Sequence, residues 1–312
     1  MIKFLKSICL FAAIQLIGSA GLMAQQEAMY SQYMFNGLIL NPAYAGSTES
    51  LSASALYRRQ WMALDGAPTT QTISVQAPIN NKKVGLGFTI INDQIAITRN
   101  FGFNGAYAYR IHTANGGAFS MGLQSGIGHL YANYNEVSLN PQNNPDNNFM
   151  DVQSFLMFNF GTGLYYNTDK FYAGLSIPYL YRAKISGMVE TTISNPQYYR
   201  HYFLTSGYVF DVNDVLKVKP SGLIKLAEGA PLQFDINTNL WFYEVFGIGA
   251  SYRSGDSMVG MLEFQVSRQF RFSYAYDHPV TKLARVTSGS HELMLRFDLV
   301  APNSKYVSTR FF

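Results

Sequence analysis

Histidine, carboxylate and serine side chains are the groups through which this chain could perform hydrolysis, because a catalytic triad needs a nucleophile, a base and an orienting group. Two histidines adjoin a carboxylate, in the pairs Asp277-His278 and His291-Glu292. Neighbouring residues on a strand point to opposite faces, so neither pair places both groups on one side. The chain also contains no Gly-x-Ser-x-Gly nucleophile turn. The other histidines are His112, His129 and His201, and isolated histidines are usually structural, so we expect no enzyme activity.

Metal and cofactor sites have recognisable spacing, and this chain shows little of it. The oxygen-rich stretch from Asn140 to Asp151 lacks the spaced acidic ligands and the glycine of an EF-hand, so a solvated loop is favoured over a calcium site. No histidine or cysteine spacing indicates zinc. Gly85-Leu86-Gly87 lies inside an expected strand and does not form a phosphate loop. We therefore expect no cofactor and no metal.

The elements that would position any site are strands, because apolar residues recur at every second position. Gln71–Ala77 and Gln233–Leu240 are clear examples. A strand points successive side chains to opposite faces, so this alternation gives one apolar face and one polar face. A soluble sandwich turns the apolar face inward, whereas a membrane barrel turns it outward to lipid. The function of the chain depends on which of the two holds.

The first 24 residues have the layout of a secretory signal peptide. Lys3 and Lys6 form a basic start, an apolar run follows over Ile8–Ile17, and we expect cleavage after Ala24. A membrane anchor is the alternative, but the run is short for crossing a bilayer. The single cysteine, Cys9, lies in this segment, so the mature chain would have no disulfide and would need another source of stability.

Composition favours a membrane barrel. Charged residues make up 13% of the chain, against about 25% in ordinary soluble domains, and aromatic residues reach 15%. Few charges and many aromatics suit a lipid-facing wall with aromatic girdles. The formal charge of +4 is too small to indicate a nucleic-acid partner. After the signal, no apolar run is long enough for a transmembrane helix, which leaves a closed barrel as the membrane-spanning form.

The alternation predicts an all-β fold, an antiparallel outer-membrane β-barrel of about 14 strands. The expected strands are Leu51–Arg58, Gln71–Ala77, Val84–Ile91, Phe101–Ile111, Ala118–Ile127, Phe155–Tyr166, Phe171–Ile177, Tyr202–Phe210, Leu216–Leu226, Leu232–Leu240, Phe246–Arg253, Met258–Val266, Phe270–Tyr276 and His291–Leu299. Pro220 falls on the apolar row of its strand, which predicts a bulge or bend. Short turns alternate with long loops, as in barrels with periplasmic turns and termini, and a soluble sandwich has no reason to sort its loops in this way.

These patterns divide the chain into four parts: a signal peptide (1–24), an N-terminal periplasmic or lumen segment (25–49), a transmembrane β-barrel (50–300) and a C-terminal periplasmic tail (301–312). The second part is rich in aromatic side chains. This favours packing in the lumen or on its periplasmic rim over a disordered leader.

Three motifs carry a resemblance to a known family. The segment Tyr30–Asn36 is followed by Asn41-Pro42-Ala43-Tyr44-Ala45-Gly46, the first hairpin reads Arg58-Arg59-Gln60-Trp61 and then Asp65–Gln71, and the chain ends in Arg310-Phe311-Phe312. Together they resemble the PorP/SprF family of outer-membrane proteins of the type IX secretion system in Bacteroidota. Phe311 is a departure, since the family would have Tyr at that position.

The resemblance implies a non-enzymatic outer-membrane component that binds the C-terminal sorting domain of a secreted adhesin. It would help to secrete or retain that adhesin at the cell surface and so support gliding motility. The implied partners are membrane lipid or lipopolysaccharide, the sorting domain, and periplasmic or outer-membrane subunits of the secretion system, with no nucleic acid. A general porin or solute channel is the main alternative, and a soluble exported all-β protein is a weaker one.

The motifs mark a set of partner-binding candidates: Asn41, Pro42, Tyr44, Gly46, Arg58, Arg59, Gln60, Trp61, Gly66, Pro68, Arg310, Phe311 and Phe312. Asn41-Pro42 predicts an extended or turn geometry, and Gly46 suits a turn before the first strand. We expect Arg58–Trp61 at the outer rim, with Trp61 as an interface anchor and Arg58 in contact with lipopolysaccharide or with Asp65. The following loop either closes the barrel and docks cargo or is an ordinary folded loop.

Overall fold

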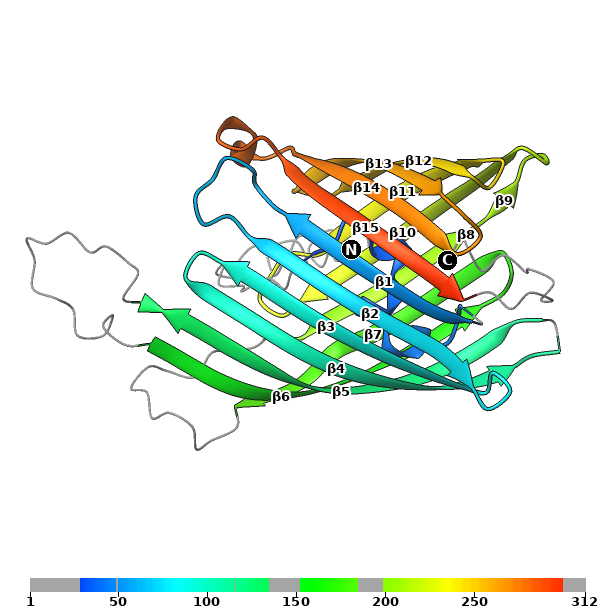
Figure 1. Cartoon of the computed structure of the whole chain (residues 1–312), viewed down its shortest axis with the longest axis horizontal. Helices are drawn as coiled ribbons and strands as arrows, with labels where there is room; N and C mark the ends of the chain where they lie inside the picture. Colours follow the sequence, from blue (N-terminus) through cyan, green and yellow to red (C-terminus); the bar gives the residue numbers. More distant parts are fainter. Residues whose placement is uncertain (1–28, 49, 115, 135–151, 185–198, 300–312) are drawn as a thin grey trace, which may run out of the picture.

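The chain forms one closed sheet of antiparallel strands (Figure 1). The computed structural model describes residues 29–48, 50–114, 116–134, 152–184 and 199–299. The strands are β1 (Leu51–Arg59), β2 (Thr69–Ile79), β3 (Val84–Ile95), β4 (Thr98–His112), β5 (Ala118–Asn133), β6 (Val152–Asn167), β7 (Phe171–Lys184), β8 (His201–Tyr208), β9 (Phe210–Asp211), β10 (Leu216–Ala227), β11 (Gln233–Phe242), β12 (Phe246–Arg253), β13 (Ser257–Gln265), β14 (Phe270–Pro279) and β15 (Ser290–Leu299). β1 pairs with β2 and β15, and β10 pairs with β8 and β11, so the sheet closes on itself.

The barrel has 14 strands and one extra short strand, which confirms the predicted fold class. β9 continues β8 beyond Val209 and pairs with β10 in the same register. Pro220 lies opposite this interruption and has no N–H to give to the ladder. The irregularity expected at Pro220 is therefore a gap in the ladder and not a bulge. The register shift is found elsewhere, between Phe160 and Thr162 of β6.

The apolar rows of the strands face outward and the charged rows face the interior. Phe88, Phe103 and Phe272 are 39% to 49% exposed, whereas Asp235 and Glu292 are at most 2% exposed. A soluble sandwich would have the opposite arrangement. A closed barrel satisfies its backbone hydrogen bonds internally and presents an apolar wall, which is the form that can cross a bilayer with strands.

The connections divide between the two ends of the barrel. The β1–β2 and β14–β15 loops lie at the left in Figure 1, together with the last residues of β5 and β7 and the short β3–β4, β10–β11 and β12–β13 turns. The right end carries short turns such as β2–β3 and β11–β12. We call these the long-loop end and the short-turn end. β1 begins and β15 ends at the short-turn end. That this end faces the periplasm stays a prediction.

No helix among the described residues is long and apolar enough to span a membrane.

The outward rows give a direct test of lipid exposure. Leu123 lies on the outer face of β5 and is 51% exposed. We expect Leu123→Arg to lower the free energy of unfolding by about 2 to 4 kcal/mol in a bilayer, because a charge would enter hydrocarbon. Chemical denaturation in lipid vesicles measures this, with Leu123→Ile as the control. Equal stability of the two variants would mean that this face meets water.

Candidate functional site

The interior of the barrel is occupied by residues Tyr30–Ser47, which we call the plug. The plug contains three short 3-10 turns, η1 (Tyr33–Phe35), η2 (Gly37–Ile39) and η3 (Pro42–Tyr44). It lies within the ring of strands in Figure 1, and nearly all of its residues are buried. A segment without a strand partner must satisfy its backbone polar groups by other means. Here, the inner wall supplies many of the partners.

A carboxylate on the wall holds the beginning of the plug. Glu292 of β15 accepts the backbone N–H groups of Ser31 and Gln32, each at 2.9 Å. Arg58 of β1 donates to the same carboxylate at 3.0 Å and to Asp277 of β14 at 2.7 Å. The Ser31 hydroxyl also donates to Asp277, at 2.6 Å. These groups are buried, and buried charges are tolerated only when they are paired in this way.

A second ion pair holds the residue before Ser31. Arg253 of β12 donates to Asp235 of β11 at 3.0 Å and to the carbonyl oxygen of Tyr30 at 3.0 Å. The Tyr30 hydroxyl forms a hydrogen bond of 2.8 Å with Thr72 of β2. The start of the plug is thus tied to strands from opposite halves of the sequence.

Further along the plug, four wall side chains bind its backbone from different strands. Arg296 donates to the carbonyl of Phe35 at 3.3 Å, and Ser176 donates to the carbonyl of Leu40 at 2.7 Å. Arg110 donates to the carbonyl of Gly46 at 2.6 Å, and the Gln76 side chain accepts the N–H of Gly46 at 3.1 Å. The plug is therefore fastened around the barrel circumference.

Asn41 sets the geometry of the last plug turn. Its side chain accepts the N–H of Ala43 at 2.9 Å and so caps η3, whose first residue is Pro42. The same side chain donates to the carbonyl of Leu164 on β6 at 2.9 Å. This accounts for the Asn-Pro pair: the asparagine is both a cap and a wall contact, and the proline fits the first turn position.

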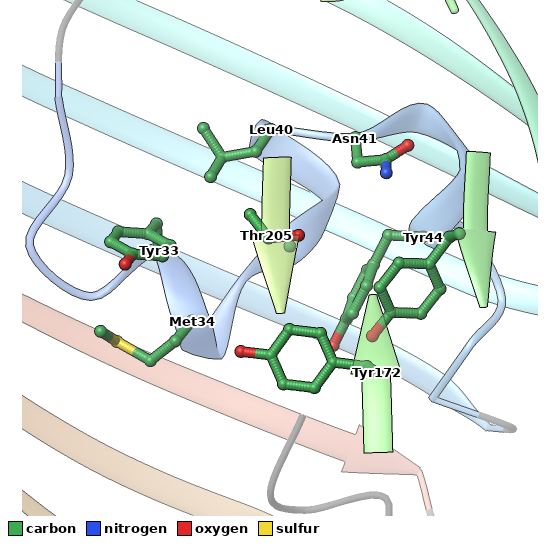
Figure 2. Close-up of a pocket in the computed structure, with 9 residues that line it drawn as sticks. Tyr33, Met34, Leu40, Asn41, Tyr44, Tyr172 and Thr205 are labelled. Carbon is green, nitrogen blue, oxygen red and sulfur yellow. The ribbon is translucent and has the colours of Figure 1, made fainter. Parts of the chain in front are cut away.

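Aromatic rings fill the space between plug and wall. Phe35 packs edge-on against Trp241, with ring centroids 6.2 Å apart, and Tyr44 packs against Tyr165 at 5.3 Å. The ammonium of Lys219 lies 5.3 Å from the centre of the Tyr172 ring. The plug residues Tyr33, Met34 and Tyr44 line a cavity together with Tyr172 of β7 (Figure 2). Its volume is about 30 Å³. This space suits a bound water molecule and is far smaller than a ligand pocket.

Two wall glycines allow the plug backbone to lie directly on the strands. A Cβ at Gly85 of β3 would overlap the carbonyl oxygen of Ala45, and one at Gly122 of β5 would overlap the backbone N of Ala43. Only glycine permits so close an approach of two backbones. The Pro-Ala-Tyr-Ala-Gly stretch thus fits a surface of matching shape.

Burial also fixes the state of the plug tyrosines. Desolvation raises the pKa of Tyr30, Tyr33 and Tyr44 above the ordinary value for phenols. Each therefore keeps its proton at any physiological pH. The Tyr33 hydroxyl can accept the hydrogen bond that Asn237 donates at 2.6 Å.

The motif residues predicted as candidates fall into two places. Asn41, Pro42, Tyr44 and Gly46 belong to the plug, which Arg58 also touches through its hydrogen bond to Ser31 at 2.7 Å. The expectation for Arg58 was wrong: its side chain is buried against Asp277 and Glu292 and meets neither lipopolysaccharide nor Asp65. Successive side chains of a strand point to opposite faces, so Arg59 points outward and Arg58 points into the barrel.

The other candidates lie in the β1–β2 loop or outside the described residues. The Gln60 N–H donates to the carbonyl of Pro68 at 2.9 Å, and the Trp61 N–H donates to the Ser290 hydroxyl at 3.2 Å. Gly66 has a φ of +71° and accepts the N–H of Ala96 through its carbonyl at 2.9 Å. The loop is thus folded onto its neighbours. Residues 310 to 312, the Arg310-Phe311-Phe312 tail, lie outside the described residues.

The motifs did not include the wall groups that hold the plug: Arg253, Asp277 and Glu292 bind it directly, and Asp235 pairs with Arg253. Asp235, Arg253 and Glu292 lie on polar rows of predicted strands, so the sequence indicated their inward direction but not their partners in the plug. Asp277 lies one residue beyond the predicted strand Phe270–Tyr276, because β14 extends to Pro279. Within the described ranges, no group of three or more His, Cys, Asp or Glu side chains could hold a metal ion.

Comparison with known proteins gives one family. The family model described as "Type IX secretion system membrane protein PorP/SprF" matches residues 22–297. Among curated proteins, none matches the chain.

Several solved structures are similar at low identity. The toluene transporter TbuX of Ralstonia pickettii is 9% identical, with a TM-score of 0.47, and the match covers 85% of this chain and 93% of that one. A FadL homologue of Pseudomonas aeruginosa is 11% identical, with a TM-score of 0.42, over 90% of this chain and 97% of that one. The fold assigned here depends on the strand pairing of this chain and not on these similarities.

The plug–wall fit predicts different costs for two glycine substitutions. Gly85→Ala would place a methyl group against the Ala45 carbonyl and displace the plug, at a cost of about 1 to 3 kcal/mol. Gly260→Ala is the control, because its Cβ would meet nothing within 4 Å on the outer face. Thermal unfolding in detergent and limited proteolysis of residues 29–48 measure the two effects. Equal behaviour would mean that the plug does not bear on this wall.

Proposed function

The chain belongs to the PorP/SprF family of type IX secretion system membrane proteins, and from this membership we propose that it binds the C-terminal sorting domain of a secreted adhesin. It is an outer-membrane β-barrel component of that system. The binding would promote secretion or surface retention of the adhesin and thereby support gliding motility. The barrel would act as a passive partner, without bond chemistry and without an energy source.

The filled interior is the observation that carries this proposal. The plug is bound to strands all around the barrel, and the cavity that it forms with Tyr172 beside Tyr44 has a volume of about 30 Å³. A sorting domain cannot pass through such a lumen. Contact with cargo must therefore use the ends of the barrel, where loops and turns are exposed.

The long-loop end offers a preorganised surface for such a contact. The backbone N–H of Met62 in the β1–β2 loop donates to the carbonyl of Gly289 at 2.8 Å, and the N–H of Ser288 donates back to the carbonyl of Met62 at 2.9 Å. Val280 and Val286 of the β14–β15 loop are exposed. Loops that are already ordered lose little entropy on binding, so they favour affinity.

The proposal extends to the rest of the chain. The signal peptide would be removed after Ala24, and both ends of the barrel chain would lie in the periplasm. Intact-mass measurement of the purified protein tests the cleavage.

Gene deletion tests the function. We expect surface display of one adhesin to be lost while other type IX cargo still reaches the surface, measured by surface labelling and by gliding speed. Complementation with the intact gene is the control. Loss of all cargo would indicate a role in the core machinery, and loss of none would contradict both roles.

A planar-bilayer measurement separates the proposal from the porin alternative. The intact barrel should show no steady conductance, because the plug fills the lumen. A variant lacking residues 30–47 should conduct, provided that its gel migration still changes on boiling as for a folded barrel. Steady conductance of the intact barrel would favour a solute channel.

A further inference from the structure

The plug begins at the long-loop end of the barrel. Arg253, which donates to the carbonyl of Tyr30 at 3.0 Å, is the last residue of β12. The Ser31 hydroxyl donates to Asp277 near the end of β14, and the Ser31 N–H donates to Glu292 near the start of β15. These strand ends lie at the long-loop end, and each wall residue is within about 7 Å of it along its strand.

The plug ends at the short-turn end. Arg110, near the end of β4, donates to the carbonyl of Gly46 at 2.6 Å. Gly85, the second residue of β3, lies so close to the plug that a Cβ on it would overlap the carbonyl of Ala45. β3 begins and β4 ends at the short-turn end, and β1 begins there at Leu51. The plug therefore crosses the lumen from one end of the barrel to the other.

The three turns of the plug follow one another along this path. In Figure 2, Tyr33 of η1 lies at the left and Tyr44 of η3 at the right, with Leu40 and Asn41 between them. The end of the plug beyond η3 continues into β1 at the short-turn end. The other end, at Tyr30, is directed to the long-loop end and is continued by no strand among the described residues.

The route of the chain before Tyr30 leads toward the long-loop face. Met29 is half-buried, whereas Tyr30 is 3% exposed, so exposure rises toward that face. A return to the short-turn end would lead back through the lumen, which residues 30–47 occupy. Glu27 comes two positions before Met29, and a carboxylate is costly to bury without a partner. Both points favour an exit into water at the long-loop end.

The wall fixes the position of this exit. Glu292 accepts the N–H groups of Ser31 and Gln32 and pairs with Arg58 at 3.0 Å. Arg58 and Glu292 lie directly opposite each other in the pairing of β1 with β15, so the plug is bound where the first and last strands meet. Removing one partner from a buried ion pair is strongly destabilising. The beginning of the plug is therefore held at the long-loop end and does not slide along the lumen.

We propose that the plug threads the barrel and that the chain before Met29 leaves at the long-loop face, on the side of the membrane opposite to the start of β1 and the end of β15. With the short-turn end in the periplasm, as proposed above, this segment would lie at the cell surface. The inference goes beyond the proposed function and does not depend on it. A partner that acts on the plug through its free end must then approach from the long-loop side.

Cysteine accessibility in cells tests this topology. The only cysteine of the chain is Cys9, so a Cys9→Ser background carries no other thiol. A single cysteine then replaces Glu27, Arg285 of the β14–β15 loop, or Lys83 of the β2–β3 turn, and the last two are exposed at opposite ends of the barrel. A membrane-impermeant maleimide is applied to intact cells and to cells with a permeabilised outer membrane. We expect position 27 to be labelled as position 285 is, and unlike position 83.

Two results would overturn the proposal: labelling of position 27 under the conditions that label position 83, and protection of position 27 in both kinds of cells. Labelling after denaturation shows that each cysteine is present, and gel migration that changes on boiling shows that each variant is folded. An epitope inserted directly before Met29, compared with the same epitope inserted after Arg285 or after Lys83, repeats the test with an antibody should processing remove position 27.

The comparison is internal to one chain, so it holds whichever end of the barrel faces the periplasm. Adhesin display measured on the same strains separates this inference from the proposed function. Normal display with position 27 on the side of position 83 would overturn the threading and leave the proposed function standing. Lost display on deletion of other cargo as well would change the proposed function and leave the threading untouched.

Discussion

The structure depends on hydrogen bonds between the buried charged side chains of the wall and the backbone of the plug. Glu292 is fully buried and accepts two backbone N–H groups of the plug as well as the guanidinium of Arg58. A carboxylate in that position without partners would be too costly to keep charged. The plug backbone, which has no ladder of its own, would have equally costly orphan groups inside the wall. Each component makes the other tolerable, so plug and wall form one folding unit.

Barrel width explains why a plug is needed. Wall side chains can fill the interior of a barrel of about eight strands, whereas much wider barrels enclose a channel. With 14 strands, this barrel is too wide for its own side chains and too narrow to need a separate domain. One segment with three short turns and several aromatic rings is enough, provided that glycines such as Gly85 and Gly122 let it approach the wall.

The strands of the wall and the directions of their side chains were predictable from the sequence, because the two-residue period of a strand involves only neighbouring residues. Alternation alone assigns Phe88 outward and Glu292 inward, and the loop lengths give the two ends. The same period could have placed Arg58 correctly: Leu56 and Arg58 are buried inside, whereas Tyr57 and Arg59 are exposed. The strand period does not show which residues an inward side chain contacts. Arg58 meets residues 219 and 234 positions away in the chain, and such pairings follow only once the barrel is closed.

The same reasoning limits where function can lie. The outer wall is apolar and meets lipid, and the interior is filled, so neither can receive a large partner. The remaining surfaces are the two ends, and they differ in kind. At the long-loop end, the β1–β2 and β14–β15 loops are bound to each other at Met62 and Gly289. At the short-turn end, Tyr243 is 71% exposed and is held in a left-handed conformation that favours asparagine. A barrel whose described interior is occupied by residues 30–47 offers its two ends to partners, which suits the proposed docking role better than that of a solute channel.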